Sequence, residues 1–219
     1  MRDKKNELYL DLVHPSHTAM ELAKSNILPF HKDGYSDAAL VEGVLNGDRA
    51  AGNALAERFA PLISRRVRRL LGSDAEHADL VQQVFVQLVK GLATLDDRQA
   101  LVDWVGRITV NVVRNELRRR SYRRIVGFST ERAEAAPASG DPELAPAVQR
   151  GAAVLEKMSV DDRIVFVLRY VEGCELKETA RLIGCSLATA KRRIARARES
   201  FMKKAARDPV LAPWVRGDV

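Results

Sequence analysis

The chain has 219 residues, a formal net charge of +7 and an aromatic content of only 5%. Its wealth of Ala, Leu, Val and Arg favours helices over sheets, and no apolar run approaches the roughly 20 residues that cross a bilayer. The N-terminal residues are basic but have no continuous apolar segment behind them, so no signal peptide is expected. We therefore expect an all-α cytoplasmic protein whose positive charge suits a polyanionic partner.

Three stretches rich in Pro, Gly or short polar residues divide the chain into two helical domains. The first stretch is an N-terminal extension, residues 1–35, which we expect to be poorly ordered. The second, residues 127–149, is rich in Ala, Pro, Gly and acids and is typical of a flexible linker. The predicted helical domains are therefore residues 36–126 and 150–207, and a C-terminal tail follows at 208–219.

The first domain is predicted to start with helices over about residues 37–45, 50–71 and 74–92. In the third helix, apolar residues recur at helical spacing from Leu80 and mark a buried face. The opposite face is polar but carries little charge, which is more typical of a protein interface than of plain solvent exposure. An ordinary exposed helix face is the alternative. The residues of this face that we expect to bind a partner are Asp79, Gln82, Gln83, Val86 and Gln87.

A fourth helix, over about residues 101–120, is the first candidate for nucleic-acid binding. Its inward side is predicted to consist of Leu101, Val105, Ile108, Val112 and Val113. An exposed Trp beside Arg and Asn combines a stacking surface with phosphate-binding groups, as single-stranded DNA binding requires. A partly buried core position is the alternative for this Trp. The outward side comprises Trp104, Arg107, Asn111, Arg114, Asn115 and Arg118.

Arginines dominate the C-terminal end of this helix. Arg119, Arg120, Arg123 and Arg124 follow the outward side, which gives seven arginines with Glu116 as the single acid between residues 107 and 124. A few basic residues there would stabilise the helix against its dipole. Seven exceed that need and support a polyanionic partner.

Residues 175–198 predict two helices around a tight turn. Gly184 can end the first helix in a left-handed conformation, and Ser186 can cap the second through its hydroxyl. Ala180 is small where the two helices must cross closely, as a helix-turn-helix requires. One side of the second helix is predicted to pack inward and consists of Leu187, Ala190, Ile194, Ala197 and Phe201.

The opposite side of that second helix combines small residues with arginines. Such a surface can enter a major groove while guanidinium groups reach base edges or phosphates. A solvated basic face is the alternative for a charge run alone, but the turn glycine, the cap and the small crossing residue together favour DNA binding. The residues predicted to contact duplex DNA are Ala188, Thr189, Lys191, Arg192, Arg193, Ala195 and Arg196.

Two segments resemble the extracytoplasmic-function (ECF) sigma factors of bacterial RNA polymerase. Region 2 of that family is similar to DLVQQVFVQL at 79–88 followed by DWVGRITVNVVRNELRRR at 103–120. Region 4 is similar to MSVDDRIVFVLRYVEGCELKETARLIGCSLATAKRRIARAR at 158–198. The matches cover about residues 37–126 and 150–206. Their order, with a linker and no third domain between them, makes the resemblance specific.

The resemblance implies a role for each surface. The polar face of helix 79–90 would bind the clamp helices in the largest subunit of core RNA polymerase, and helix 187–198 would read the −35 promoter element. The linker would pass toward the RNA exit channel. Many members are held inactive by an anti-sigma factor, which makes such a protein a candidate partner. The melted −10 strand would be held by Leu95, Asp96, Asp97 and Arg98 in the loop at 91–99, which takes a flipped base, and by Trp104, Arg107, Asn111, Arg114, Asn115 and Arg118.

The chain departs from the usual pattern of the family at several positions. Gln83 stands where an acid is usual, Val89 where Trp is common, and Asn115 where Asp is common. Ala190 is smaller than the usual Val or Ile, which predicts looser packing or a different tilt of the recognition helix. These differences bear on the promoter sequence rather than on the class of protein.

Other classes of protein fit the sequence less well. A repressor or activator that acts without polymerase needs an effector-binding or dimerisation domain before its helix-turn-helix. A recombinase needs a catalytic Ser or Tyr among arginines, for which Tyr122 is the nearest candidate. A pure protein-interaction module leaves the basic helices unexplained. Phosphate loops, nucleophile elbows and metal-spaced His/Cys sets are absent from the sequence, and the N-terminal His14, His17 and His31 have no Cys beside them, so we expect no enzyme, no cofactor and no metal.

Overall fold

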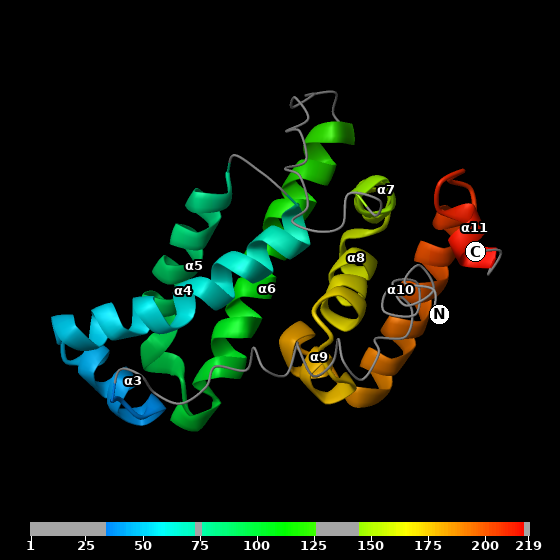
Figure 1. Ribbon diagram of the computed structural model, residues 1–219. Coiled ribbons are helices and arrows are strands. Elements are labelled where there is room, and N and C mark those ends of the chain that lie inside the picture. The colour runs from blue at the N-terminus through cyan, green and yellow to red at the C-terminus, as the bar shows by residue number, and fades with distance from the viewer. Residues whose placement is uncertain (1–33, 73–75, 126–144, 217–219) are drawn as a thin grey trace, which may run out of the picture. The chain divides into compact units, whose positions relative to one another are not determined.

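The computed structural model describes residues 34–72, 76–125 and 145–216, and these form two compact units (Figure 1). One unit holds α3 (Asp37–Leu45), α4 (Arg49–Leu71), α5 (His77–Gly91) and α6 (Leu101–Ile125). The other holds α7 (Ala145–Glu156), α8 (Val160–Phe166), most of α9 (Leu176–Ile183), α10 (Leu187–Ala205) and α11 (Ala212–Arg216). Every element in the described ranges is helical, which confirms the prediction of an all-α fold. No helix in these ranges is both long and apolar enough to cross a membrane.

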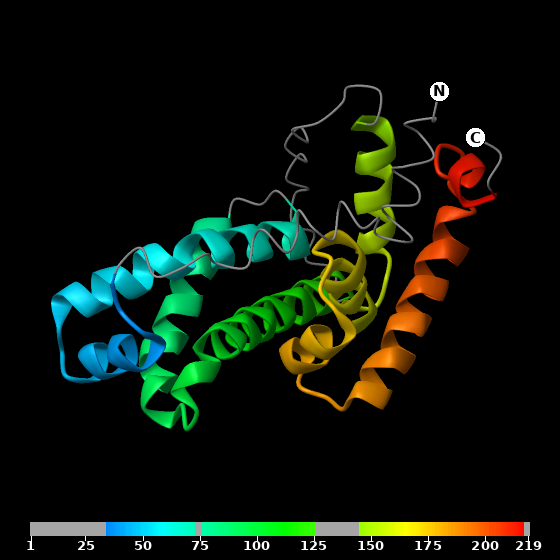
Figure 2. The ribbon, with the colours of Figure 1, turned by 60° about the horizontal axis from the view of Figure 1, so that its bottom comes forward.

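In the first unit, α4 packs against each of the other three helices, and α5 also packs against α6 (Figures 1 and 2). Side-chain caps fix where the helices begin. The Ser36 hydroxyl accepts a hydrogen bond from the backbone N–H of Ala39, and the Asp48 carboxylate accepts one from Ala50. Two short 3-10 turns, η1 (Leu92–Thr94) and η2 (Arg98–Ala100), connect α5 to α6.

The core of this unit consists of large side chains at helical spacing. Fully burying one such side chain contributes roughly 1.5–3 kcal/mol, so this set supplies much of the stability of the unit. The buried face that the sequence predicts for α5 is present, with Leu80, Val84 and Leu88 inside. The largest fully buried side chains of the unit are Leu40, Phe59, Ile63, Leu70, Leu80, Leu88, Leu92 and Leu101.

In the second unit, α8 packs along α10. The Ser159 hydroxyl caps α8 by accepting a hydrogen bond from the backbone N–H of Asp162, and a π-helical turn, η3 (Val167–Val171), extends the helix. Phe166 at the end of α8 stacks on Phe201 of α10, with ring centroids 4.2 Å apart and an interplanar angle of 19°. This buried aromatic pair joins the two helices within the core of the unit.

Two helices form where the sequence predicts little order. Helix α7 begins at Ala145, inside the predicted linker of residues 127–149. Pro146 falls in its first turn, where a helix loses no hydrogen bond to proline. Helix α11 forms within the predicted tail, where the Asp208 carboxylate accepts hydrogen bonds from the backbone N–H groups of Val210 and Leu211. Residues 1–33 of the predicted extension and the rest of the linker lie outside the described residues.

Candidate nucleic-acid interface

The turn between α9 and α10 has the geometry that the sequence predicts. Gly184 has a φ of 68°, in the left-handed region that favours glycine. The backbone N–H of Cys185 donates to the carbonyl of Ala180 at 3.0 Å, and that of Gly184 donates to Arg181 at 3.3 Å, which together close the end of α9. The Ser186 hydroxyl then caps α10 by accepting from the backbone N–H of Thr189.

The inward side of α10 differs from the prediction at its first position. Ala190, Ala197 and Phe201 are buried, whereas Ile194 is half-buried. Leu187 was expected inside but is 46% exposed, so that prediction is wrong. The reason is its place as the first residue of α10, since burial along this helix begins one turn later.

The predicted DNA-contacting side of α10 faces solvent over its first turns. Ala188, Lys191, Arg192, Ala195 and Arg196 are exposed, and Thr189 and Arg193 are half-buried. The Thr189 hydroxyl accepts a hydrogen bond from the Ser186 hydroxyl at 3.0 Å, so Thr189 also takes part in capping. Small residues therefore alternate with cations on one accessible surface, the arrangement that lets a helix approach a major groove.

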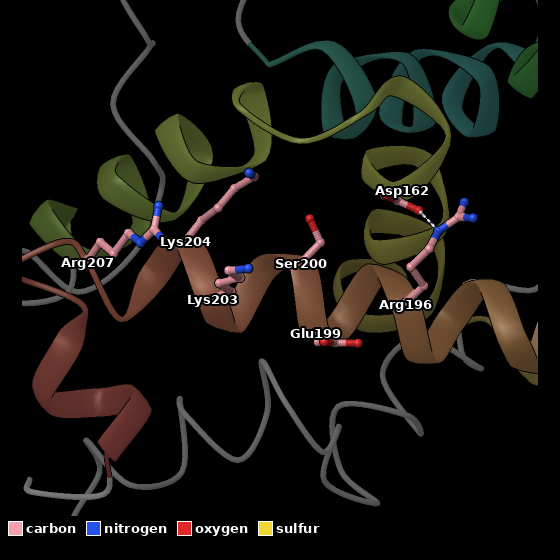
Figure 3. A pocket seen from close by; sticks show the side chains of 7 residues that line it. All are labelled: Asp162, Arg196, Glu199, Ser200, Lys203, Lys204 and Arg207. Carbon is pink, nitrogen blue, oxygen red and sulfur yellow. Dashed lines mark hydrogen bonds and ion pairs between the residues drawn. The ribbon is translucent and has the colours of Figure 1, made fainter.

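Arg196 is fixed by a neighbouring helix (Figure 3). Its Nε donates to Oδ1 of Asp162, in the first turn of α8, at 2.8 Å, while its side chain stays 60% exposed. No pattern in the sequence predicts this pair, which joins two different helices. An open groove of about 490 Å³ continues from this pair along α10 and is lined by Asp162, Arg196, Glu199, Ser200, Lys203, Lys204 and Arg207.

In the first unit, the predicted partner-binding face of α5 is accessible. Asp79, Gln82, Gln83, Val86 and Gln87 are all exposed. The same five side chains line a groove of about 980 Å³ whose other wall is α6. The residues that α6 contributes to the groove are Trp104, Ile108, Asn111, Val112, Asn115, Glu116 and Arg119. The structure thus brings together two sets of residues that the sequence assigns to different partners.

Two corrections concern α6. Trp104 was expected on the exposed side but is only 8% exposed, because its ring packs over Gly91, where an added Cβ would lie 3.1 Å from Cζ2 of the indole. Ile108 and Val112 were expected inside but are half-buried, since they face the groove beside α5 rather than the core. The prediction of an open stacking platform at Trp104 is therefore wrong for this structure, although Trp104 is among the residues that line the groove.

The remaining predicted strand-binding residues of α6 lie at or near the surface. Arg107, Asn111, Asn115 and Arg118 are exposed, and Arg114 is half-buried. A hydrogen bond of 2.6 Å from Arg114 to Oδ1 of Asn111 orients the Asn111 amide. This face can therefore present hydrogen-bonding groups in fixed positions to bases or phosphates.

The loop after α5 is partly ordered by its own polar side chains. The Asp97 carboxylate accepts a hydrogen bond from the backbone N–H of Gln99 and caps η2. Arg98 forms an ion pair with Glu42 of α3. Asp96 is exposed and Leu95 is half-buried. Asp97 and Arg98 thus hold the loop against the helices, in addition to any contact they make with a ligand.

Glu116 forms ion pairs on this surface that the sequence analysis does not predict. It is only 7% exposed, and its two carboxylate oxygens accept hydrogen bonds of 2.7 Å from Nε of Arg119 and Nε of Arg120. Burial alone would raise the pKa of Glu116, but the hydrogen bonds and charges of these two arginines outweigh it and hold the pKa below the ordinary value. The one sign of these ion pairs in the sequence is the spacing of i, i+3 and i, i+4 between Glu116 and the two arginines, which permits such pairs without requiring them.

A helix-turn-helix unit with a basic exposed face and a separate helical unit with a polar groove define a two-part DNA-binding protein. Comparison with protein families identifies the class more narrowly. The family model for Sigma-70 region 2 matches residues 55–123, and the family model for Sigma-70, region 4 matches residues 152–201. The chain belongs to the sigma-70 family of RNA polymerase sigma factors, in its ECF group.

Individual relatives agree with this assignment. The chain is 29% identical over 183 residues to the ECF RNA polymerase sigma-E factor of Escherichia coli K12, which covers 77% of this chain and 94% of the relative. The sigma-E factor of Haemophilus influenzae is 26% identical over 181 residues, covering 77% of this chain and 95% of the relative. The protein is thus an alternative sigma factor, and a helix-turn-helix regulator without polymerase is not favoured.

Solved structures share the fold. CnrH, in complex with the cytosolic domain of CnrY, matches with a TM-score of 0.53 and 23% identity, covering 76% of this chain and 95% of that one. RpoE from Bartonella quintana, in complex with the anti-sigma factor NepR, matches with a TM-score of 0.55 and 21% identity, covering 71% and 97%. At these identities the likeness supports the two-domain helical fold alone.

Proposed function

We propose that this sigma factor divides promoter recognition between its two units. Region 2, at about residues 36–126, docks on core RNA polymerase through Asp79, Gln82, Gln83, Val86 and Gln87, and holds the melted −10 strand through α6 and the loop before it. Region 4, at about residues 150–207, reads the −35 element through the exposed turns of α10. The observation that carries this proposal is the pair of accessible surfaces, one polar groove and one basic helix face, on separate units.

The chemistry of each surface supports its assigned partner. The α5 wall of the groove carries three glutamines and one acid, which suits a protein partner better than a phosphate backbone. The exposed turns of α10 carry Lys191, Arg192 and Arg196, which suit DNA. In this scheme Trp104 supports the −10 face from beneath by packing, and its neighbours Asn111 and Asn115 make the contacts with the strand.

Three further parts of the proposal concern the setting of the protein. It acts by directing and opening DNA for polymerase and has no catalytic activity of its own. It works in the cytoplasm, where the polymerase works. An anti-sigma factor is a fitting partner, because the two similar structures are of CnrH in complex with the cytosolic domain of CnrY and of RpoE in complex with the anti-sigma factor NepR.

Reconstituted transcription tests the proposal. Purified full-length chain is added to core RNA polymerase with fragments of the host genome, and run-off transcripts are sequenced to locate their start sites. We expect start sites preceded by common −35 and −10 elements, and none with core polymerase alone. A chain that binds DNA but does not bind core polymerase would overturn the proposal.

A further inference from the structure

The arginine-rich end of α6 carries its own counter-charge. Glu116 accepts hydrogen bonds from Arg119 and Arg120 at 2.7 Å, and its Oε1 lies 3.4 Å from a terminal nitrogen of Arg123. Glu76, at the start of α5, adds a second carboxylate 2.9 Å from Arg120 and 3.5 Å from Arg119. Two acids therefore form ion pairs with three of the arginines that the sequence analysis assigns to a polyanionic partner.

Burial makes the ion pairs of Glu116 stronger than those of Glu76. Its carboxylate is almost withdrawn from solvent, so its attraction to the guanidinium groups is screened less than that of an exposed ion pair. The hydrogen bond to Glu116 also raises the pKa of Arg119 above its ordinary value. The Arg119 side chain is nevertheless 57% exposed, so an external anion can reach the same guanidinium.

A carboxylate and a DNA phosphate present similar oxygen pairs to a guanidinium fork. When Glu116 holds Arg119 and Arg120, a phosphate can recruit them only by displacing that carboxylate. We propose that Glu116 is a specificity-determining residue for DNA binding, which keeps these two arginines from contributing to sequence-independent contacts. The groups free of this acid, such as Arg107 and Asn111, then carry a larger share of the recognition.

The physical consequence is a lower background of binding to unrelated DNA. Sequence-independent affinity comes almost entirely from phosphate contacts, and each contact adds about 0.9 to the slope of log K against log salt concentration. Withholding two arginines lowers that affinity without touching base readout. This inference builds on the proposed function, since it concerns the same α6 surface, but its test needs neither polymerase nor a promoter.

The test compares the full-length chain with Glu116→Gln on a fluorescent duplex that lacks any promoter, across a series of salt concentrations. Gln is nearly the same size, removes the charge and replaces one of the two acceptor oxygens by an NH2 donor, so it can no longer hold both arginines. We expect tighter binding at low salt and a slope steeper by roughly one to two units, the contribution of two released arginines. Glu57→Gln on α4 is the matched control, because Glu57 is exposed, makes no ion pair with another described residue, and changes the net charge equally. It should leave the slope unchanged.

Two more variants separate this role from a structural one. Glu76→Gln removes the partly exposed acid and should steepen the slope by a smaller amount, which gives a result even if Glu116→Gln fails to fold. Adding Arg119→Gln and Arg120→Gln to Glu116→Gln should return the slope to that of the original chain. A variant that merely loses structure should bind DNA more weakly, which is the opposite of the tighter binding expected here. Slopes for Glu116→Gln and Glu76→Gln equal to that of Glu57→Gln, or weaker binding by folded protein, would overturn the inference. Failure in reconstituted transcription would instead count against the proposed function alone.

Discussion

At the scale of single residues, the two central arginines of the recognition helix differ in a way that the sequence does not show. Arg196 is held by Asp162 of α8, whereas Arg192 has no ion pair with another described residue. Arg192 can therefore adapt its side chain to a base edge, and Arg196 offers a guanidinium whose position is set before DNA arrives. Under the proposed function, we therefore expect Arg192 to make most of the base-reading contacts with the −35 element.

Arg192→Ala should remove the preference for the correct −35 element and leave core-polymerase binding intact. An arginine that contacts a base contributes about 1–3 kcal/mol of discrimination. The measurement is initiation from matched promoters with an intact or a scrambled −35 element, together with a titration of core polymerase. Loss of core binding in this variant would show that the division between the two units is wrong.

Glu116 should also make the first unit sensitive to acid. Its pKa is lowered in the folded protein and returns to the ordinary value of about 4.5 on unfolding, so the ionised carboxylate stabilises the fold above that value. This contribution is lost as pH falls through the lowered pKa. Chemical denaturation at neutral pH and at several pH values below 4.5 should show a loss of stability in the original chain that is smaller in Glu116→Gln. Identical pH profiles would contradict this assignment.

At the scale of elements, the turn between α9 and α10 could be predicted from the sequence because its causes are local. Ser186 caps α10 and Gly184 ends α9, as expected. The faces of α6 could not be predicted as well. Helical periodicity distinguishes only a buried face from an exposed face. Because α6 packs against both α4 and α5, its side chains face three surroundings, namely a core, a groove and solvent. Trp104, Ile108 and Val112 fall where these surroundings meet.

Trp104 provides a test of that account. Because its ring is buried against Gly91, Trp104→Ala should lower the free energy of unfolding of the first unit by about 3 kcal/mol, as large-to-small core substitutions do. Urea denaturation followed by circular dichroism measures the change. A variant with unchanged stability and weakened binding to single-stranded −10 DNA would restore the interpretation of Trp104 as an open stacking platform.

The polar face of α5 is the second element with a direct test. Replacing Gln82 and Gln87 together by Ala should weaken core-polymerase binding while duplex DNA binding stays unchanged, because both side chains are exposed on the groove wall assigned to the polymerase. Only a minority of interface side chains contribute more than 1 kcal/mol each, so we expect a combined loss of about 1.4 kcal/mol, or about tenfold, for the pair. Asn53→Ala, on an exposed position of α4, is the control. Equal losses in both variants would argue against this docking face.

At the scale of the whole molecule, the order of the two regions and the helical class follow from the sequence, whereas the contacts between distant segments do not. The pairing of Glu76 with Arg120 joins residues 44 positions apart, and that of Arg196 with Asp162 joins residues 34 apart. Such pairs depend on how helices pack and leave no periodic pattern. The same holds for the groove, which exists only because α5 and α6 lie side by side.

The two compact units differ in how readily amino-acid substitutions can change one function without changing another. The turns of α10 that are proposed to read DNA share few side chains with any other proposed task, so a substitution there should change one property at a time. The groove of the first unit mixes side chains proposed for polymerase with side chains proposed for melted DNA. A substitution there alters two properties together. Over evolutionary time, new promoter preferences should therefore arise more readily through α10 than through the walls of the groove.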